Sequence, residues 1–204
     1  MAFVMKSTFS LLTWAGVASI LLAIPHGCSK RAESSEVVLH DSVYVNQGDR
    51  IVALTFDTLR KSLQGAIAQG NFEGAIAFCR EQANPVTTTY ADSFKIRRTA
   101  LRVRNPDNRP DSLELAVLIG MGNEMQAARQ PGVKVVRTSN EVHFFKPIIL
   151  QAMCLNCHGT PGQQIADRTL TRIRELYPAD QAVNFKEGDL RGAWHITFER
   201  PKPK

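Results

Sequence analysis

The sequence lacks any apolar run long enough to cross a bilayer as a helix. The longest such stretch, from Phe9 to Ile24, is shorter than the roughly 20 residues that the hydrocarbon core demands. Charged residues make up 22% of the 204 residues and hydrophobic residues 44%, which are ordinary values for a globular protein. The composition excludes a collagen-like chain, a coiled coil and wholesale disorder, and the length suffices for one domain with a core.

Also absent is any recognisable nucleic-acid-binding module or platform of aromatic and basic side chains. The formal net charge of +6 then has three remaining interpretations: a solvated surface, attraction to an anionic membrane, or steering toward an acidic protein partner. We therefore expect no nucleic-acid partner.

The short apolar stretch near the N-terminus has the properties of a secretory signal. Lys6 supplies a positive charge before it, and Pro25-His26-Gly27 interrupts it just before Cys28. Gly27-Cys28-Ser29 is similar to a bacterial lipoprotein cleavage site, although Pro25 and His26 depart from that pattern. We predict a signal peptide over 1–27, a lipidated Cys28 and a periplasmic or exported protein that meets the membrane only through its lipid. Cleavage nearby without lipidation, or an uncleaved anchor, are the alternatives.

Beyond residue 28, hydrophobic periodicity indicates a mixture of helices and antiparallel strands. Val52, Phe56, Leu59 and Leu63 fall on one helical stripe, and Asn84-Pro85 is expected to end the following helix. The predicted order is a polar tether over 28–46, helices over 49–69 and 72–83, a strand over 95–104, a helix starting at 110–111, hairpin strands over 133–137 and 141–148, a helix over 164–177 and a strand over 194–198. This mixture predicts one α+β domain.

The most specific motif is Cys154-Leu155-Asn156-Cys157-His158. Two thiols separated by two residues match the two vinyl groups on one porphyrin edge, and the next residue places an imidazole under the iron. Gly159 allows the backbone to turn away from the crowded ring edge. The motif predicts one covalent c-type haem, held by Cys154 and Cys157 and ligated by His158.

Three other interpretations of the two thiols are weaker. A thioredoxin-like pair belongs to a βαβ pattern that the sequence does not show. A zinc site would need a second ligand pair at zinc spacing, and a disulfide across so short a loop would be strained. Export also fits haem attachment, because unpaired thiols otherwise tend to oxidise outside the cytosol.

The second axial ligand of the iron remains open on residue type alone. The candidates are Cys79, His143, His195, Met121 and Met125, whereas Met153 adjoins the attachment loop and suits this role poorly. Methionines on a helical face are more often core filler, strand histidines are more often structural, and a buried cysteine often acts as a small hydrophobe. Cys79 stands out as the soft donor with no other assignment, on an inward helical face.

Four stretches carry a resemblance to a known family. They are Gly74–Cys79, Ile96–Asn108 with Pro110-Asp111, Lys146–Ile148 leading into Cys154–Gly159, and Gly188–Ala193. Over about 47–199 the chain resembles bacterial c-type haem domains with a PAS-like sensor fold, once described as a domain of unknown function and also found in histidine kinases and chemoreceptors.

The resemblance implies a PAS-like antiparallel sheet flanked by helices over 47–200, with His158 and Cys79 as the two axial ligands. Because the chain ends at Lys204 without a signalling module, we expect any signal to pass to a separate protein partner. Four arginines in the second stretch could also pair with the haem propionates: Arg97, Arg98, Arg102 and Arg104.

These expectations favour an exported haem protein that senses redox state or a diatomic gas such as CO or NO. Thiolate ligation favours ferric iron, so reduction could loosen Cys79 and open a gas site. The alternative is a small periplasmic electron-transfer protein. We expect no enzymatic activity, because no distal acid–base residue for a peroxidase can be placed.

Overall fold

The computed structural model describes residues 30–89 and 94–199, and side chains from Asp41 onward. The expected signal peptide over 1–27 and the expected lipid site at Cys28 lie outside the described residues. Within the described part of the chain, no helix is both long enough and apolar enough to span a membrane.

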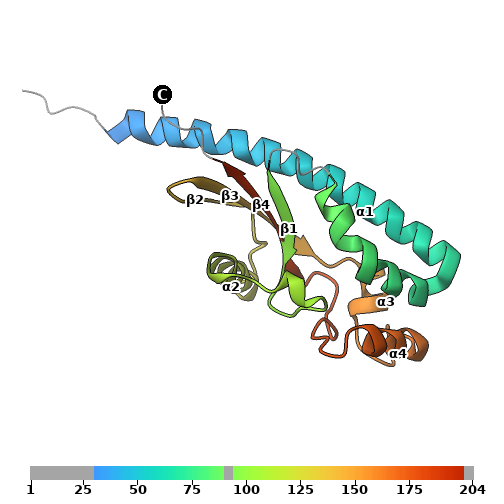
Figure 1. Ribbon diagram of the computed structural model, residues 1–204. Helices are drawn as coiled ribbons and strands as arrows, with labels where there is room; N and C mark the ends of the chain where they lie inside the picture. Colours follow the sequence, from blue (N-terminus) through green and yellow to red (C-terminus); the bar gives the residue numbers. More distant parts are fainter. Residues whose placement is uncertain (1–29, 90–93, 200–204) are drawn as a thin grey trace, which may run out of the picture.

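The first element, α1 (Lys30–Thr88), consists of two helical arms. They join at Gly70 and Asn71, where Asn71 has a φ of 56°, in the left-handed region that asparagine tolerates better than most residues. The second arm folds back beside the first (Figure 1). The predicted break between two helices near residue 71 is therefore confirmed.

Two predicted boundaries of this helical region differ from the structure. The segment expected as a tether is helical from Lys30, and Tyr44 is buried against Phe198, with ring centroids 5.3 Å apart. Periodicity missed it because only one side of so long a helix meets the sheet. The helix also continues through Pro85 to Thr88, where the Thr87 hydroxyl donates to the carbonyl of Ala83.

Four antiparallel strands form one sheet in the order β1-β4-β3-β2. Their bounds are β1 (Lys95–Thr99), β2 (Lys134–Arg137), β3 (Glu141–Ile149) and β4 (Leu190–Glu199). The β2–β3 hairpin is confirmed. The strand expected over 95–104 ends at Thr99, because the chain bends there and the Ala100 N–H donates to the carbonyl of Asn108.

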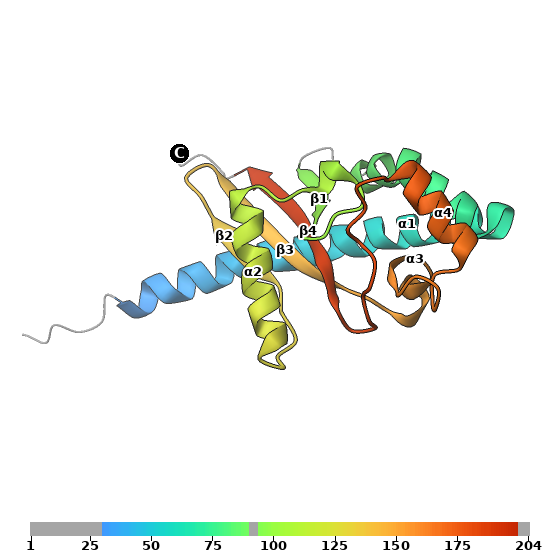
Figure 2. The same ribbon diagram turned by 90° about the horizontal axis from the view of Figure 1, so that it is seen from below.

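The sheet has a different helix on each face. Figure 1 shows α1 running along one face, and Figure 2 shows α2 (Ser112–Gln126) lying across the other. A capping box starts α2: the Asp111 side chain accepts from the Glu114 N–H, and the Glu114 side chain accepts from the Asp111 N–H. The α+β class is thus confirmed, while the PAS-like description of the sheet stays a prediction.

Between α1 and the sheet lies the main hydrophobic core. Gly48 permits the close approach of α1, because a Cβ atom there would lie 2.6 Å from the ring of the buried Phe144. On the other face, Leu118 and Met121 of α2 pack against Phe145 and Ala193.

The remaining short elements gather at one end of the sheet, beside the second arm of α1 (Figure 1). They are the short helix η1 (Pro106–Asn108), the short helix η2 (Ala152–Cys154), α3 (Leu155–His158) and α4 (Asp167–Leu176). Ile76 of α1 packs against Ile165, Ile173 and Tyr177 around α4. This end of the molecule carries the candidate site.

Candidate haem-binding site

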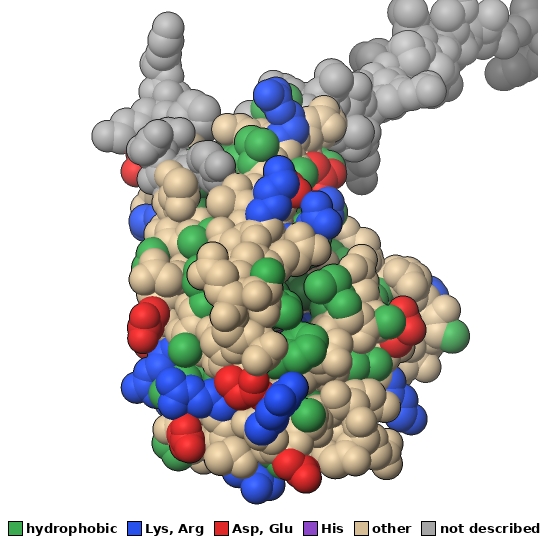
Figure 3. Space-filling model, turned by 90° about the vertical axis from the view of Figure 1, so that its right-hand side faces the viewer, with side chains coloured by type: hydrophobic (Ala, Val, Ile, Leu, Met, Phe, Trp, Pro, Cys, Tyr) green, Lys and Arg blue, Asp and Glu red, His purple; other side chains and the backbone are tan. Residues whose placement is uncertain are grey.

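A deep cavity lies between the second arm of α1, the end of the sheet and α3. Its volume is about 270 Å³, near the lower end of the range of about 300–1,000 Å³ typical of small-ligand pockets, and it opens to solvent at its mouth. Figure 3 shows this face of the molecule, hollowed where hydrophobic side chains gather. The apolar part of the lining is Phe56, Leu59, Leu63, Ile67, Phe72, Ala75, Ile76, Ile148, Leu150, Met153 and Trp194.

The Cys-x-x-Cys-His motif lies on the wall of this cavity. Cys154 ends η2, α3 carries Cys157 and His158, and all three residues line the cavity. Both cysteines are free of disulfide bonds. Burial raises the pKa of the Cys157 thiol to about 11, so this side chain holds its proton at neutral pH.

His158 has the tautomer and charge that a metal ligand needs. Its Nδ1 lies 2.7 Å from the carbonyl oxygen of Ala182, and since a carbonyl only accepts, Nδ1 carries the proton. Burial, with the positive charge of Arg104 second, lowers the pKa of His158 well below its usual value. The ring is therefore neutral, and the lone pair on Nε2 is free. The hydrogen bond from Nδ1 to the Ala182 carbonyl fixes the orientation of the ring.

The motif loop is fastened to the body of the domain by a buried salt bridge. The Arg104 guanidinium contacts both carboxylate oxygens of Asp180, at 3.1 and 3.0 Å, and donates to the carbonyl of Cys157 at 2.7 Å. The side chains of Arg104 and Asp180 are 9% and 7% exposed. Gly159 is required at the next turn, because a Cβ atom there would lie 2.6 Å from the Leu155 carbonyl oxygen.

Cys79 reaches the same cavity from the second arm of α1. Burial raises the pKa of its thiol, while the charges of Arg98 and Arg104 act in the opposite direction. The structure therefore brings together Cys79, Cys154, Cys157 and His158, which are separated by up to 79 positions in the sequence. An inward helical face alone could not place Cys79 opposite a particular loop.

Two half-buried arginines of the cavity lack a carboxylate partner within salt-bridge distance among the described residues. Arg98 donates to the Asn84 amide oxygen at 3.3 Å, and its Nε has no partner. Arg191 donates to the carbonyl of Arg102 at 2.9 Å, and burial lowers the pKa of Arg191 to about 10. The buried hydroxyl of Thr99, also in the lining, has no partner either.

The four arginines predicted to meet propionates separate into two pairs. Arg98 and Arg104 line the cavity, whereas Arg97 and Arg102 are outside its lining. Arg97 donates to the carbonyls of Asp107 and Arg109, at 2.7 and 3.0 Å. Arg102 donates to the carbonyls of Gln181 and Val183. Of these four arginines, Arg98 is the one with a buried nitrogen that has no partner among the described residues. Arg191, to which the sequence assigned no chemistry, likewise lines the cavity without a carboxylate partner in the described part of the chain.

The other candidate axial ligands are outside the cavity lining. Met121 is fully buried against α2's own core cluster, and His143 and His195 are hydrogen-bonded to each other behind the sheet. Met125 is also absent from the lining, and Met153 belongs to it but is 44% exposed. Of the five candidates, only Cys79 shares a cavity with His158.

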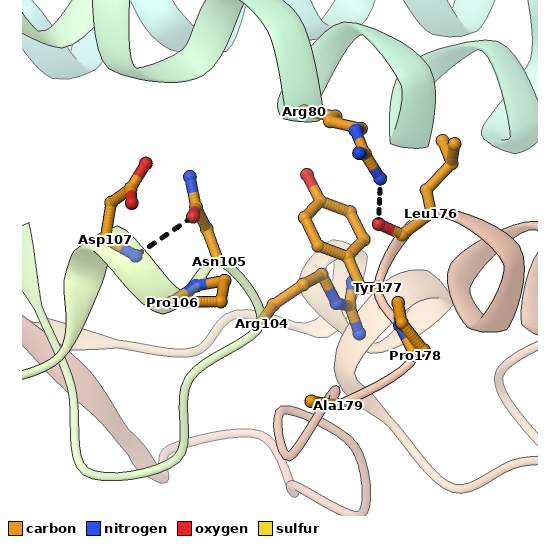
Figure 4. Close-up of a pocket in the computed structure, with 9 residues that line it drawn as sticks. All are labelled: Arg80, Arg104, Asn105, Pro106, Asp107, Leu176, Tyr177, Pro178 and Ala179. Carbon is orange, nitrogen blue, oxygen red and sulfur yellow. Dashed lines mark hydrogen bonds between the residues drawn. The ribbon is translucent and has the colours of Figure 1, made fainter.

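A second cavity, of about 390 Å³, adjoins the first and shares Arg104, Asn105 and Tyr177 with its lining. Figure 4 shows the Tyr177 hydroxyl directed toward α1, between Asn105 and Arg80. Burial raises the pKa of Tyr177 to about 12, so the phenol remains a neutral donor. Nothing in the sequence pattern marked Tyr177, because its role depends on the fold of the loop after α4.

An apolar cavity with unneutralised arginines suits a flat, mostly hydrophobic group that bears carboxylates. The two cysteines and the histidine of the motif on its wall add the donors that c-type haem attachment uses. The residues present therefore fit a haem. Fold and site together define a small α+β domain with one apolar, cationic cavity that presents a Cys-x-x-Cys-His loop.

Comparison with known proteins agrees with this class. The Tll0287-like family model matches residues 36–199, and the chain belongs to that family. A solved structure, described as the crystal structure of the cyanobacterial heme-protein Tll0287, matches with a TM-score of 0.52 and 26% sequence identity. The match covers 75% of this chain and 95% of that one. No curated protein matches the chain.

Proposed function

We propose that this chain binds one haem covalently through Cys154 and Cys157, with His158 and Cys79 as axial ligands of the iron. The observation that carries the proposal is the convergence of these four residues on one cavity with apolar walls and two arginines, Arg98 and Arg191, that have no carboxylate within salt-bridge distance among the described residues. Membership of the Tll0287-like family, and likeness to a structure described as a heme-protein, support it.

Each residue of the site has a definite task in this proposal. His158 offers a neutral Nε2, because Nδ1–H donates to Ala182. The salt bridge of Arg104 with Asp180 holds the motif loop in register with the cavity. Arg98 and Arg191 would neutralise propionates or a thiolate, and the apolar lining would exclude water from the ring.

The role that we propose is sensing of redox state or of a diatomic gas. Bound haem would supply a reversible one-electron change at its iron. Burial raises the pKa of the Cys79 thiol, so this side chain stays a thiolate only while positive charge nearby compensates. If a bound haem iron lost one positive charge on reduction, the raised pKa of Cys79 would favour protonation and release of this side chain. Apart from His158, the described lining holds no imidazole or carboxylate, and we propose no enzymatic role.

The test is maturation of the full chain in a bacterial periplasm that attaches haem. We expect one haem that survives denaturing electrophoresis. The double variant Cys154→Ser/Cys157→Ser should lose it, whereas Cys79→Ser should keep it but lose the thiolate features of the oxidised absorption spectrum. A wild-type chain that takes up no covalent haem would overturn the proposal.

Addition of CO to the reduced protein separates sensing from electron transfer. Formation of a CO complex in the wild type supports release of Cys79 and a sensing role. A spectrum unchanged by CO supports an electron carrier, for which the positive net charge could assist docking on an acidic partner.

We also propose that the chain is exported and lipidated at Cys28. Support comes from the charge and apolar stretch before Gly27-Cys28. It also comes from the attachment motif, because bonding to haem would protect Cys154 and Cys157 from the oxidation that free thiols undergo outside the cytosol. Membrane fractionation should find the wild type in the membrane and Cys28→Ala in the soluble periplasmic fraction. Equal distribution of the two would contradict lipidation.

A further inference from the structure

A second cluster of ionisable side chains lies behind the sheet, on the face covered by α2. Glu114, His195 and His143 are 0%, 5% and 7% exposed. His195 Nδ1 lies 2.6 Å from Glu114 Oε1, and His143 Nδ1 lies 3.0 Å from His195 Nε2. None of the three lines the haem cavity, and the proposed function does not use them.

The hydrogen bonds determine where each proton sits. A carboxylate only accepts, so His195 carries a proton on Nδ1. In the tautomer with this single proton, its Nε2 accepts, and both His143 Nδ1 and Thr197 Oγ1 lie within hydrogen-bond distance of it. His143 must then donate from Nδ1 to His195. Glu114 stays ionised, because its other oxygen accepts from the Asp111 N–H at 3.0 Å and lies 3.3 Å from Arg97. In this arrangement Nε2 of His143 carries no proton, and no hydrogen-bond donor to it is found among the residues that the structure describes.

The titratable groups near His143 belong to β3, to β4 and to the start of α2. Glu141, two residues earlier on β3, has an oxygen 3.7 Å from His143 Nε2, and it is partly exposed. Burial and the neighbouring His195 lower the pKa of His143, whereas the charges of Glu141, Asp111 and Glu114 act to raise it. A proton can therefore reach Nε2 from solvent beside Glu141, and it would arrive in a largely buried space.

We propose that Glu114, His195 and His143 form a proton-binding site, filled at Nε2 of His143, and that its occupation weakens the packing of α2 on the sheet. The three hydrogen-bonded side chains come from different elements: Glu114 from α2, His195 from β4 and His143 from β3. A charge added to them therefore lies at the interface between α2 and the sheet. One proton is taken from solvent and no bond other than N–H forms.

The direction of the pH effect follows from linkage. Because the pKa of His143 is lower in the folded protein than the usual 6.5, the unfolded chain binds more protons just below that pH. Stability is then fully present above pH 6.5 and falls as the pH drops below it. Glu114 adds a loss of the same sign at more acidic pH, because the His195 and Asp111 hydrogen bonds outweigh burial and keep its pKa low.

The test measures the denaturant midpoint of the full chain as purified, between pH 8 and pH 5. His143→Asn is the variant of choice, because an asparagine amide can replace the Nδ1–H donor without titrating. We expect the wild-type midpoint to fall below pH 6.5, and the variant to lose at least about half of that fall. Equal falls in the two proteins would overturn the proposal.

NMR titration of the His143 ring keeps the proposal testable if the variant folds poorly. The ring should titrate below pH 6.5, and Glu141→Gln should move the titration to still lower pH, because the nearest carboxylate is removed. A ring that titrates at or above pH 6.5, or that ignores Glu141→Gln, would contradict a proton site at Nε2. Neither measurement depends on the haem.

Discussion

The two faces of the sheet both bury charge, but they do so differently. Behind the sheet, Glu114 is satisfied by His195, Asp111 and Arg97. On the cavity face, the Nε of Arg98 has no hydrogen-bond partner among the described residues. Buried polar groups normally have hydrogen-bond partners, so the unsatisfied Arg98 nitrogen indicates that a group other than the protein binds on this face.

Strand β1 shows this contrast between adjacent residues. Arg97 and Arg98 point to opposite faces, as alternation requires; the first pairs with Glu114 and backbone carbonyls, and the second lines the cavity. The same residue type is thus structural on one face and available to a ligand on the other. Substitutions on the two faces test whether their charged residues have these different roles.

The largest effect should come from Arg104, which lines the cavity and is paired with the buried Asp180. Arg104→Met leaves the buried Asp180 carboxylate unpaired and frees the Cys157 carbonyl, and removal of one partner of a buried pair costs about 3–5 kcal/mol. Urea unfolding would measure it. Arg172→Gln, in an exposed pair with Glu175, is the matched control and should change the free energy of unfolding far less. Similar losses would show that Arg104 has no special structural role.

A smaller effect is expected at Gly48, where α1 meets the sheet. Gly48→Ala places a methyl group 2.6 Å from the Phe144 ring, and overpacking of this kind costs about 1–3 kcal/mol. Gly65→Ala is the control in the same helix, because nothing lies within 4 Å of its Cβ position. That control should gain stability by roughly 0.5–1 kcal/mol. Thermal or urea unfolding of both variants decides whether α1 lies as close as described.

The smallest change in stability, and the most direct comparison of the faces, comes from Arg98 and Arg97. Arg98→Met removes a buried cation without a carboxylate, so we expect haem-free protein to unfold no more easily than the wild type. The pKa of Cys79 should rise further, because the Arg98 charge that lowers it is gone. Arg97→Met should leave the Cys79 pKa unchanged. Ultraviolet titration of the thiolate would measure both, and an equal shift in the two variants would break the comparison.

Periodicity and turn residues predicted much of the fold from local patterns. The hairpin strands near Val133–Arg137 and Glu141–Ile148, the helix after Asp111 and the break near Asn71 all appear in the structure. The predictions were wrong where contacts between distant segments determine the local structure. The helix found in place of the expected tether packs against the sheet through Tyr44. Strand β1 ends at Thr99 because the next residue, Ala100, is hydrogen-bonded to Asn108.

The motif Cys154–His158 is found from the sequence alone, since the spacing of two cysteines and a following histidine is a property of one short segment. The sequence also singled out Cys79 as an unassigned soft donor. Three features of the site are visible in the tertiary structure alone. Cys79 shares a cavity with His158, and the Ala182 carbonyl sets the His158 tautomer. Arg98 and Arg191 have no carboxylate within salt-bridge distance among the described residues. Burial and pairing depend on segments up to about a hundred residues apart, which no local pattern encodes.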